Sequence, residues 1–324
     1  MKYETLWRRL TGIYDTDEAK AIVRWVLDVR FGLSLTDIVC GKVDELPAAA
    51  QAELEVMMQR LEAAEPVQYV VGVAEFCGRK FHVEPGVLIP RPETGELCDF
   101  VIEGVKGELE GVKGELEGVK GELKGQYSAI EDEPYSILDI GTGSGCIAIT
   151  LALEMKEAKV TAWDVSEKAL HIAQENAKML GADVTFEKQD ILKLEEQNIS
   201  LTIPEQSSPT RSLSHLLTLT SKYDLIVSNP PYVCDKEKAT MERHVLEHEP
   251  HLALFVPDDD PLRFYRAIAQ YAQAALKHGG LLYFELNPLY ARETEALLQD
   301  LGFAETEIKP DMFGKQRFLK AKKI

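Results

Sequence analysis

Hydrophobic side chains recur at helical spacing through the first part of the chain. Ile22, Trp25 and Val29 are three or four positions apart, and similar runs come before and after them. Such a period predicts amphipathic helices whose apolar faces pack against one another. Asp15 precedes a threonine and two acidic residues, which is typical of a helix N-cap. We therefore expect a small helical domain over residues 1–71.

Residues 72–90 change the pattern to short strand-like runs. Gly78 and the Pro85-Gly86 pair interrupt these runs, and glycine and proline in such positions are typical of turns. The segment is predicted to be a β-hairpin that links the helical domain to the rest of the chain.

Strand-like and helix-like segments alternate from Tyr135 onward. The apolar runs SILDI, TAWDVS, YDLIVS and GGLLYFEL are separated by amphipathic stretches such as EKALHIAQENAKML. Buried parallel strands joined by crossover helices produce this alternation. We therefore expect an α/β domain over residues 91–324, with a doubly wound, mostly parallel, Rossmann-like sheet whose ligands bind at the carboxyl ends of the strands. The Lys-rich segment Lys315–Lys323 is predicted to be a solvated edge strand in preference to an RNA-binding patch.

Two stretches interrupt this pattern. Residues 105–125 are three tandem copies of a heptad, VKGELEG, VKGELEG and VKGELKG. Because each glycine costs about 1 kcal/mol in a helix, we interpret the repeat as an inserted, frayed or disordered surface excursion, with a partner-binding coiled coil as the alternative. Residues 195–221 are rich in Ser, Thr, Gln and Pro and are predicted to be an inserted polar loop.

The composition is that of a globular protein and limits its partners. Hydrophobic residues make up 45% of the 324 positions and charged residues 28%, which excludes collagen-like and disordered classes. Fifty-four acids against 36 bases give a net charge of −18, and this charge repels nucleic-acid phosphates and anionic lipid. Since no apolar stretch suits a signal peptide or a spanning helix, we expect a cytoplasmic protein.

No metal site is predicted. The five cysteines are scattered without any C-x-x-C pair, which suits reduced thiols better than a disulfide or zinc framework. His244 and His248 share a helix face but lack a fourth-ligand pattern, so we interpret them as structural. Cys234 is interpreted as a small packing residue in preference to a reactive thiol.

A glycine-rich turn, Asp139–Gly145, follows the run SILDI directly. Glycines allow a tight turn and let backbone N–H groups approach a ligand. The spacing G-x-G-x-G differs from the G-x-G-x-x-G of nicotinamide sites. Asp164 ends the next strand, where it could accept hydrogen bonds from ribose hydroxyls. Asp190 could accept from an adenine amine, and Ile191 could pack on the ring. A nucleoside site without a diphosphate anchor fits S-adenosylmethionine, whose product is S-adenosylhomocysteine.

Asn229-Pro230-Pro231-Tyr232 follows the run DLIVS. The two prolines fix φ and remove two N–H donors, so the loop presents carbonyl oxygens beside the Asn229 side-chain oxygen. This is an acceptor site for a planar NH₂ group. If Asn229 Oδ1 and the Pro230 carbonyl each take one hydrogen, the nitrogen lone pair turns toward the methyl sulfonium and Tyr232 packs on the planar group. Positioning then carries the catalysis without a general base.

These motifs define the predicted site. The catalytic residues are Asn229, Pro230 and Tyr232. The cofactor residues are Gly141, Thr142, Gly143, Ser144, Gly145, Asp164, Asp190, Ile191 and Asn229. The substrate residues are Asn229, Pro230, Pro231 and Tyr232.

Three motifs together resemble one known family. LIPRPET at 88–94, ILDIGTGSG at 137–145 and SNPPY at 228–232 follow a helical N-terminal domain, as in the HemK/PrmC family of peptide chain release factor glutamine N5-methyltransferases. The resemblance implies that the substrate is the glutamine of the Gly-Gly-Gln loop of class I release factors, and that the N-terminal domain docks the release factor. We expect a monomer. Gly95 and Asn287 depart from the family, where an acid and a glycine are more usual.

Two other functions fit some of these residues. A nucleic-acid adenine N6-methyltransferase would present the same planar NH₂ to the same loop, although the charge of −18 disfavours it. A non-catalytic module that binds translation factors would keep the fold, but both ligand motifs are intact.

Overall fold

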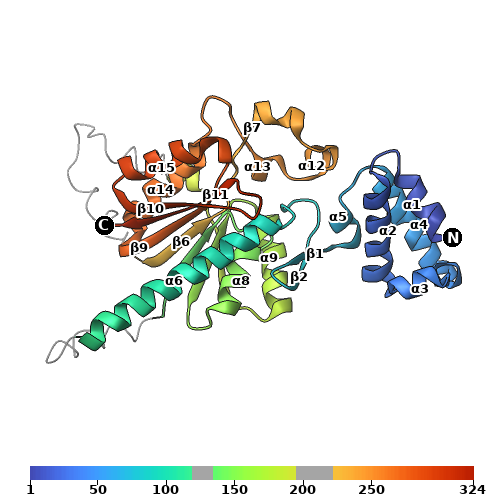
Figure 1. Cartoon of the computed structure of the whole chain (residues 1–324), viewed down its shortest axis with the longest axis horizontal. Helices are drawn as coiled ribbons and strands as arrows, with labels where there is room; N and C mark the ends of the chain where they lie inside the picture. Colours follow the sequence, from blue (N-terminus) through green and yellow to red (C-terminus); the bar gives the residue numbers. More distant parts are fainter. Residues whose placement is uncertain (119–133, 195–221) are drawn as a thin grey trace. The chain divides into compact units, whose positions relative to one another are not determined.

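The computed structural model describes residues 1–118, 134–194 and 222–324, which group into two compact units (Figure 1). One unit comprises Met1–Ala74, His82–Ile89 and Ala239–Pro250, and the other comprises Glu75–Phe81, Pro90–Lys238 and His251–Ile324. The domain boundaries that the sequence predicts, at 71/72 and 90/91, are not tested by this division and stay a prediction.

The first unit is helical, as its apolar spacing predicts. Its helices are α1 (Tyr3–Leu10), α2 (Thr16–Phe31), α3 (Leu35–Val39), η1 (Lys42–Glu45), α4 (Ala48–Glu62), α5 (Val67–Val71) and α12 (Arg243–His248). The carboxylate of Asp15 accepts from the N–H groups of residues 17 and 18 and so caps α2, and Gly32 ends this helix with φ +65°. Leu10, Val26 and Met58 have no exposed surface, and they belong to one core that holds the helices before residue 72 together.

A segment from late in the sequence belongs to this helical unit. The carboxylate of Glu249 accepts from the N–H of Ile89 at 3.2 Å, and Nε2 of His248 lies 3.2 Å from the carbonyl oxygen of Ala63. His244 Nδ1 lies 3.2 Å from a Glu242 carboxylate oxygen. Within the described ranges, no group of three or more His, Cys, Asp or Glu could hold a metal ion.

The predicted hairpin is present. Strands β1 (Val73–Phe76) and β2 (Arg79–His82) pair in a two-stranded sheet. The turn residues Cys77 and Gly78 have φ values of +46° and +71°, and a two-residue turn with positive φ at both positions matches the twist of the two strands.

A seven-stranded sheet forms the centre of the second unit. Its strands are β3 (Ser136–Ile140), β4 (Lys159–Asp164), β5 (Val184–Lys188), β6 (Tyr223–Ser228), β9 (Leu276–Glu285), β10 (Phe303–Pro310) and β11 (Gln316–Lys323). They lie in the order β10-β11-β9-β6-β3-β4-β5. The five strands from β9 to β5 are parallel, and β11 is antiparallel to both its neighbours. The predicted doubly wound, mostly parallel sheet is confirmed.

One strand prediction is wrong. Strand β11 lies between β10 and β9, so β10 and not the Lys-rich segment is the edge. Phe318 and Leu319 have no exposed surface because they point to opposite faces of the sheet, one into each of its two cores.

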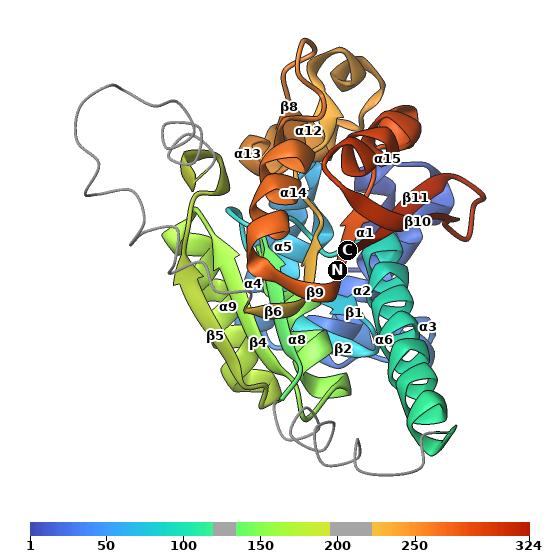
Figure 2. The same cartoon turned by 90° about the vertical axis from the view of Figure 1, so that its left-hand side faces the viewer.

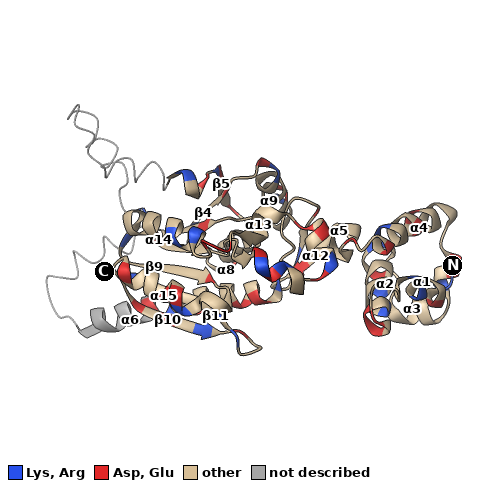
Figure 3. Ribbon diagram, turned by 90° about the horizontal axis from the view of Figure 1, so that it is seen from above, with Lys and Arg blue, Asp and Glu red and all other residues tan. Residues whose placement is uncertain are grey.

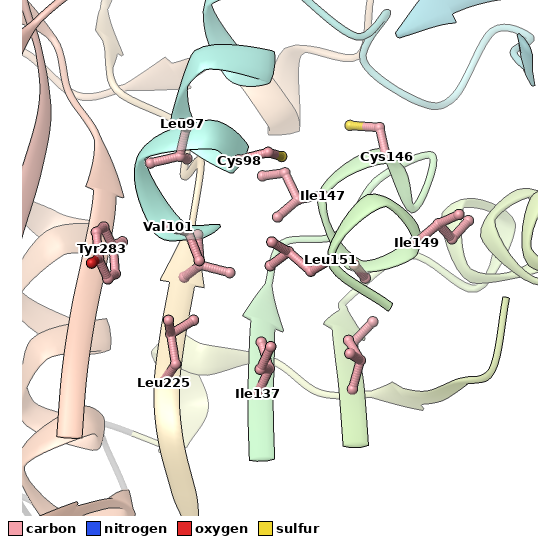
Figure 4. Packing of buried hydrophobic residues seen from close by; sticks show 14 of the residues in the cluster. Leu97, Cys98, Val101, Ile137, Cys146, Ile147, Ile149, Leu151, Leu225 and Tyr283 are labelled. Carbon is pink, nitrogen blue, oxygen red and sulfur yellow. The ribbon is translucent and has the colours of Figure 1, made fainter. Parts of the chain in front are cut away.

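Helices cover both faces of this sheet. They are α6 (Pro92–Gly118), α8 (Cys146–Glu154), α9 (Glu167–Leu180), α14 (Arg263–Ala275) and α15 (Ala291–Asp300). The short elements of the second half of the chain are η2 (Asp235–Thr240), α13 (His251–Leu254), η3 (Pro288–Tyr290) and the paired strands β7 (Val233–Cys234) and β8 (Phe255–Val256). Leu97 and Val101 of α6 pack with Ile147 of α8 over Ile137 and Leu225 (Figure 4). Helices α14 and α15 cover the other face (Figure 2).

Helix α6 continues through the first two copies of the heptad, to Gly118. The prediction of a frayed or disordered excursion is therefore wrong for residues 105–118, and the third copy lies outside the described residues. Leu97, Val101 and Val105 are buried, so the helix is already formed when it reaches the repeat. The costly nucleation of the helix occurs in these packed turns, before the repeat. The glycines of the repeat therefore weaken only the propagation of the helix. The predicted polar loop at 195–221 also lies outside the described residues.

No helix among the described residues is long and apolar enough to cross a membrane. Blue and red segments alternate along the helices of each unit (Figure 3), so charges of both signs share the surface of the part of the chain that the structure describes.

Candidate active site

The glycine turn joins the end of β3 to the start of α8. Gly141, Gly143 and Gly145 have φ values of +80°, +56° and +83°, which side chains other than glycine rarely adopt. A Cβ on Gly145 would also lie 2.8 Å from Ile149 and 3.1 Å from Ala173. This position therefore requires glycine for both conformation and space.

Unpartnered polar atoms gather in this turn. Both carboxylate oxygens of Asp139 and the hydroxyls of Thr142 and Ser144 are buried without a hydrogen-bond partner among the described residues. Burial raises the pKa of Asp139 to about 7, and the nearby Thr142 hydroxyl and Ala148 amide oppose this rise without meeting hydrogen-bond geometry. Buried acceptors without donors are costly, so the turn suits a ligand that brings N–H or O–H groups.

Asp164 links the turn to the next strand, β4. One carboxylate oxygen accepts from the N–H of Gly143 at 2.9 Å and the other from the N–H of Ser166 at 2.8 Å. Burial raises the pKa of Asp164, and these backbone N–H groups lower it in part. A carboxylate has about four lone-pair sites, so acceptor capacity is left for a ligand.

Asp190 and Ile191 follow β5, beside Asp164. The N–H of Gln189 donates to the Asp164 carbonyl at 3.1 Å. The Asp190 carboxylate accepts from the N–H of Leu192 at 3.2 Å and therefore also stabilises a turn. Ile191 is 8% exposed and lies in the core cluster that contains Trp163.

The Asn229 loop follows β6, the other neighbour of β3. The hydroxyl of Ser228 donates to the carbonyl of Ile140 at 2.6 Å, so the residues that begin the glycine turn and the Asn229 loop come from adjacent strand ends. Asn287 braces the loop from the end of β9, because its Nδ2 donates to the carbonyl of Tyr232 at 3.0 Å. The departure from the family at Asn287 thus has a local role.

A buried carboxylate lies beneath this loop. Glu285 accepts from the Thr94 hydroxyl at 2.7 Å and from the Tyr232 hydroxyl at 2.9 Å. Asn229 Nδ2 donates to the Thr94 hydroxyl oxygen at 3.1 Å. Burial raises the pKa of Glu285, and the two hydroxyls and the charge of Arg317 lower it in part. Burial likewise raises the pKa of Tyr232 well above its ordinary value.

The sequence prediction assigns no role to three residues of the site, Asp139, Thr94 and Glu285. Asp139 begins the glycine motif and Thr94 ends LIPRPET, so both lie in recognised motifs. Glu285 gives only a weak signal, an acid at the end of the apolar run LLYFEL. Thr94 and Glu285 are 191 positions apart, and only the fold brings them together.

Known protein families match both units. Residues 7–72 match the model of the PrmC N-terminal domain, and residues 131–285 match a methyltransferase domain. The methyltransferase match covers the predicted glycine turn and the Asn229 loop.

Curated relatives align along nearly the whole chain. A release factor glutamine methyltransferase of Bacteroides thetaiotaomicron is 42% identical over 96% of this chain and 95% of its own. The protein of the same name from Flavobacterium psychrophilum is 37% identical over 96% of this chain and 94% of its own. That of Streptococcus pneumoniae is 32% identical over 87% of this chain and 78% of its own.

Proposed function

The chain belongs to the release factor glutamine methyltransferase family, and from this premise we propose how its residues share the methylation of a glutamine side chain. Residues Gly141–Gly145, Asp164, Asp190 and Ile191 hold S-adenosylmethionine, and Asn229 contacts both the cofactor and the substrate. Residues Asn229–Tyr232 hold the amide of the substrate glutamine, whose nitrogen receives the methyl group. The unpartnered acceptors of the glycine turn carry the cofactor assignment.

The residues of the glycine turn fit such a cofactor. Asp139 offers a carboxylate without a donor, which suits the ammonium group of the methionine part. Asp164 keeps acceptor capacity for ribose hydroxyls beside its two backbone donors. When bound, S-adenosylmethionine supplies an electrophilic methyl group.

The Asn229 loop orients the acceptor nitrogen. Asn229 Oδ1 and the Pro230 carbonyl each accept one hydrogen of the glutamine amide in the amide plane, which leaves the nitrogen lone pair, perpendicular to that plane, free to attack. As the new C–N bond forms, positive charge grows on the nitrogen and both oxygens stabilise it. The amide proton becomes acidic only then, so it leaves after methyl transfer and no general base is needed first.

The protein partner is proposed to be a class I release factor, through its Gly-Gly-Gln loop. We assign the helical unit the docking of the release factor body. Its match to the PrmC N-terminal domain supports this role, as does the exposure of Leu35 and Val39 on its surface. The adenine N6-methyltransferase alternative has no support from the relatives' names, and the charge of −18 opposes it.

Methyl transfer from labelled S-adenosylmethionine to a purified release factor tests the function. Label should enter the release factor and should be absent when the loop glutamine is replaced by alanine. A DNA fragment is the parallel acceptor. Label on DNA alone would assign the enzyme to the adenine class. Label that persists in the alanine variant would move the modified residue elsewhere in the release factor.

A further inference from the structure

Thr94 lies between the carboxylate of Glu285 and the amide of Asn229. Its hydroxyl oxygen is 2.7 Å from Glu285 Oε2 and 3.1 Å from Asn229 Nδ2. Thr94 and Glu285 are each 3% exposed. At this burial, neighbouring protein groups and not bulk water must satisfy their hydrogen bonds.

Counting hydrogens fixes the direction of both bonds while Glu285 is ionised, the state that the Thr94 and Tyr232 hydroxyls and the charge of Arg317 favour. A carboxylate only accepts, and a threonine hydroxyl has one hydrogen. That hydrogen goes to Glu285, so the Thr94 oxygen can only accept from Asn229. The NH₂ group of Asn229 must therefore face Thr94. If the amide turned over, Oδ1 of Asn229 would face an oxygen that has no hydrogen to give.

The second oxygen of Glu285 restrains the same loop. Tyr232 donates its hydroxyl hydrogen to Oε1 at 2.9 Å. One carboxylate thus holds both ends of the Asn229–Tyr232 loop, through Thr94 at one end and directly at the other. Buried charge-assisted hydrogen bonds of this kind are stronger than neutral ones.

We propose that Thr94 and Glu285 are positioning residues that fix the Asn229 amide with Oδ1 toward the substrate, and that they thereby make the enzyme select glutamine over glutamate. This inference rests on the proposed function of the Asn229 loop. An outward Oδ1 complements the N–H groups of a glutamine amide. The same oxygen repels the acceptor-only carboxylate of a glutamate, which would leave both partners without a hydrogen.

The matched variants Thr94→Val and Thr94→Ser test the proposal. Valine keeps the shape and removes the acceptor, whereas serine keeps the hydroxyl. For each enzyme we would measure kcat and KM with a release factor, and the inhibition constant of the same release factor with glutamate in place of the loop glutamine. Titration with S-adenosylmethionine checks that each variant keeps its fold and its cofactor affinity.

In the wild-type enzyme the glutamate form should inhibit poorly. In Thr94→Val the amide can turn over, so kcat should fall at least about tenfold and the preference for glutamine over glutamate should fall by a similar factor. Thr94→Ser should retain the wild-type preference. Glu285→Gln, which can donate to Thr94 and release its hydroxyl hydrogen toward Asn229, should shift the preference in the same direction as valine.

An unchanged glutamine preference in folded Thr94→Val would overturn the proposal, and if that variant does not fold, an unchanged preference in Glu285→Gln would do the same. A loss of cofactor affinity equal to the loss of kcat would also overturn it, because the effect would then be general. Failure of the wild-type enzyme to label any release factor is a different result, and it would contradict the proposed function itself.

Discussion

At the scale of single residues, the buried carboxylate of Asp139 links the pH dependence of folding stability to cofactor binding. Its pKa of about 7 lies above the ordinary value of 3.8, so between these two pH values the folded protein binds more protons than the unfolded chain. The contribution of Asp139 to the free energy of unfolding therefore falls as pH rises through this window. The ionised form of Asp139 is the one that a cationic ligand would stabilise.

Asp139→Asn should remove this dependence. Urea unfolding at pH 5 and at pH 8 should show the variant gaining stability relative to wild type at the higher pH, by an amount on the order of a few kcal/mol. S-adenosylmethionine affinity should fall in the same variant at pH 8. A stability difference between variant and wild type that is equal at both pH values would contradict a raised pKa at this position.

The roles of Asn229 and Asp164 separate in kinetics. Asn229→Ala removes an acceptor for the substrate amide, so turnover should be lost while cofactor affinity is largely kept, because the other cofactor residues remain. Asp164→Ala removes the acceptor for the ribose and the partner of the Gly143 N–H, so cofactor affinity should weaken about tenfold or more. Calorimetric titration together with kcat checks both. Equal losses of affinity and turnover in Asn229→Ala would argue against this division.

At the scale of elements, helix α6 shows why similar glycines in one helix are not equivalent. A Cβ on Gly104 would lie 2.0 Å from the hydroxyl oxygen of Tyr283, whereas a Cβ on Gly107 would meet nothing within 4 Å. The ring of Tyr283 is fully buried and packs edge-on against Phe100 at 5.2 Å. The ring is therefore held in place, and the helix needs glycine at 104 to approach β9.

Gly104→Ala should destabilise the protein by about 1 to 3 kcal/mol, because an added methyl group overpacks the core. Gly107→Ala should stabilise it by up to about 1 kcal/mol through helix propensity alone. Thermal or urea unfolding measures both changes. The double variant Gly104→Ala/Tyr283→Phe removes the clashing oxygen and should recover part of the loss. Equal effects at 104 and 107 would mean that Tyr283 does not limit the helix.

The elements themselves could largely be predicted from periodicity. The parallel strands, the hairpin and the first helices follow from local patterns, and the ends of β3, β4 and β6 follow from the motifs placed after them. The prediction for Lys315–Lys323 is wrong because a lysine-rich segment resembles an edge strand, whereas the buried Phe318 and Leu319 show that this strand lies inside the sheet. The prediction for the repeat is wrong up to Gly118 because helix propensity alone leaves out the packed turns that precede the repeat. The Thr94–Glu285 contact could not be predicted, because the two residues are 191 positions apart and no local sequence pattern relates them.

At the scale of the whole molecule, the helical unit has no role in methyl transfer that its own residues reveal. Within its described residues, Leu35 and Val39 are 57% and 78% exposed, one helical turn apart on α3. Neighbours at this spacing lie on the same face of a helix. If a release factor docks there, the glutamine loop gains a high effective concentration at the methyltransferase unit. The binding energy gained at α3 then lowers KM for the intact release factor.

The double variant Leu35→Ser/Val39→Ser should therefore raise KM for an intact release factor by roughly tenfold, as expected when about 1.4 kcal/mol of apolar burial is lost. The KM for a short peptide that contains the Gly-Gly-Gln sequence should not change, because such a peptide reaches only the Asn229 loop. Met179→Ser, which removes a similarly exposed side chain (57%) from α9 of the other unit, is the matched control and should affect neither substrate. An equal rise in KM for peptide and intact protein would indicate damage to the site. An unchanged KM for both would place the docking surface away from α3, since the peptide and the release factor differ only in what they offer beyond the loop.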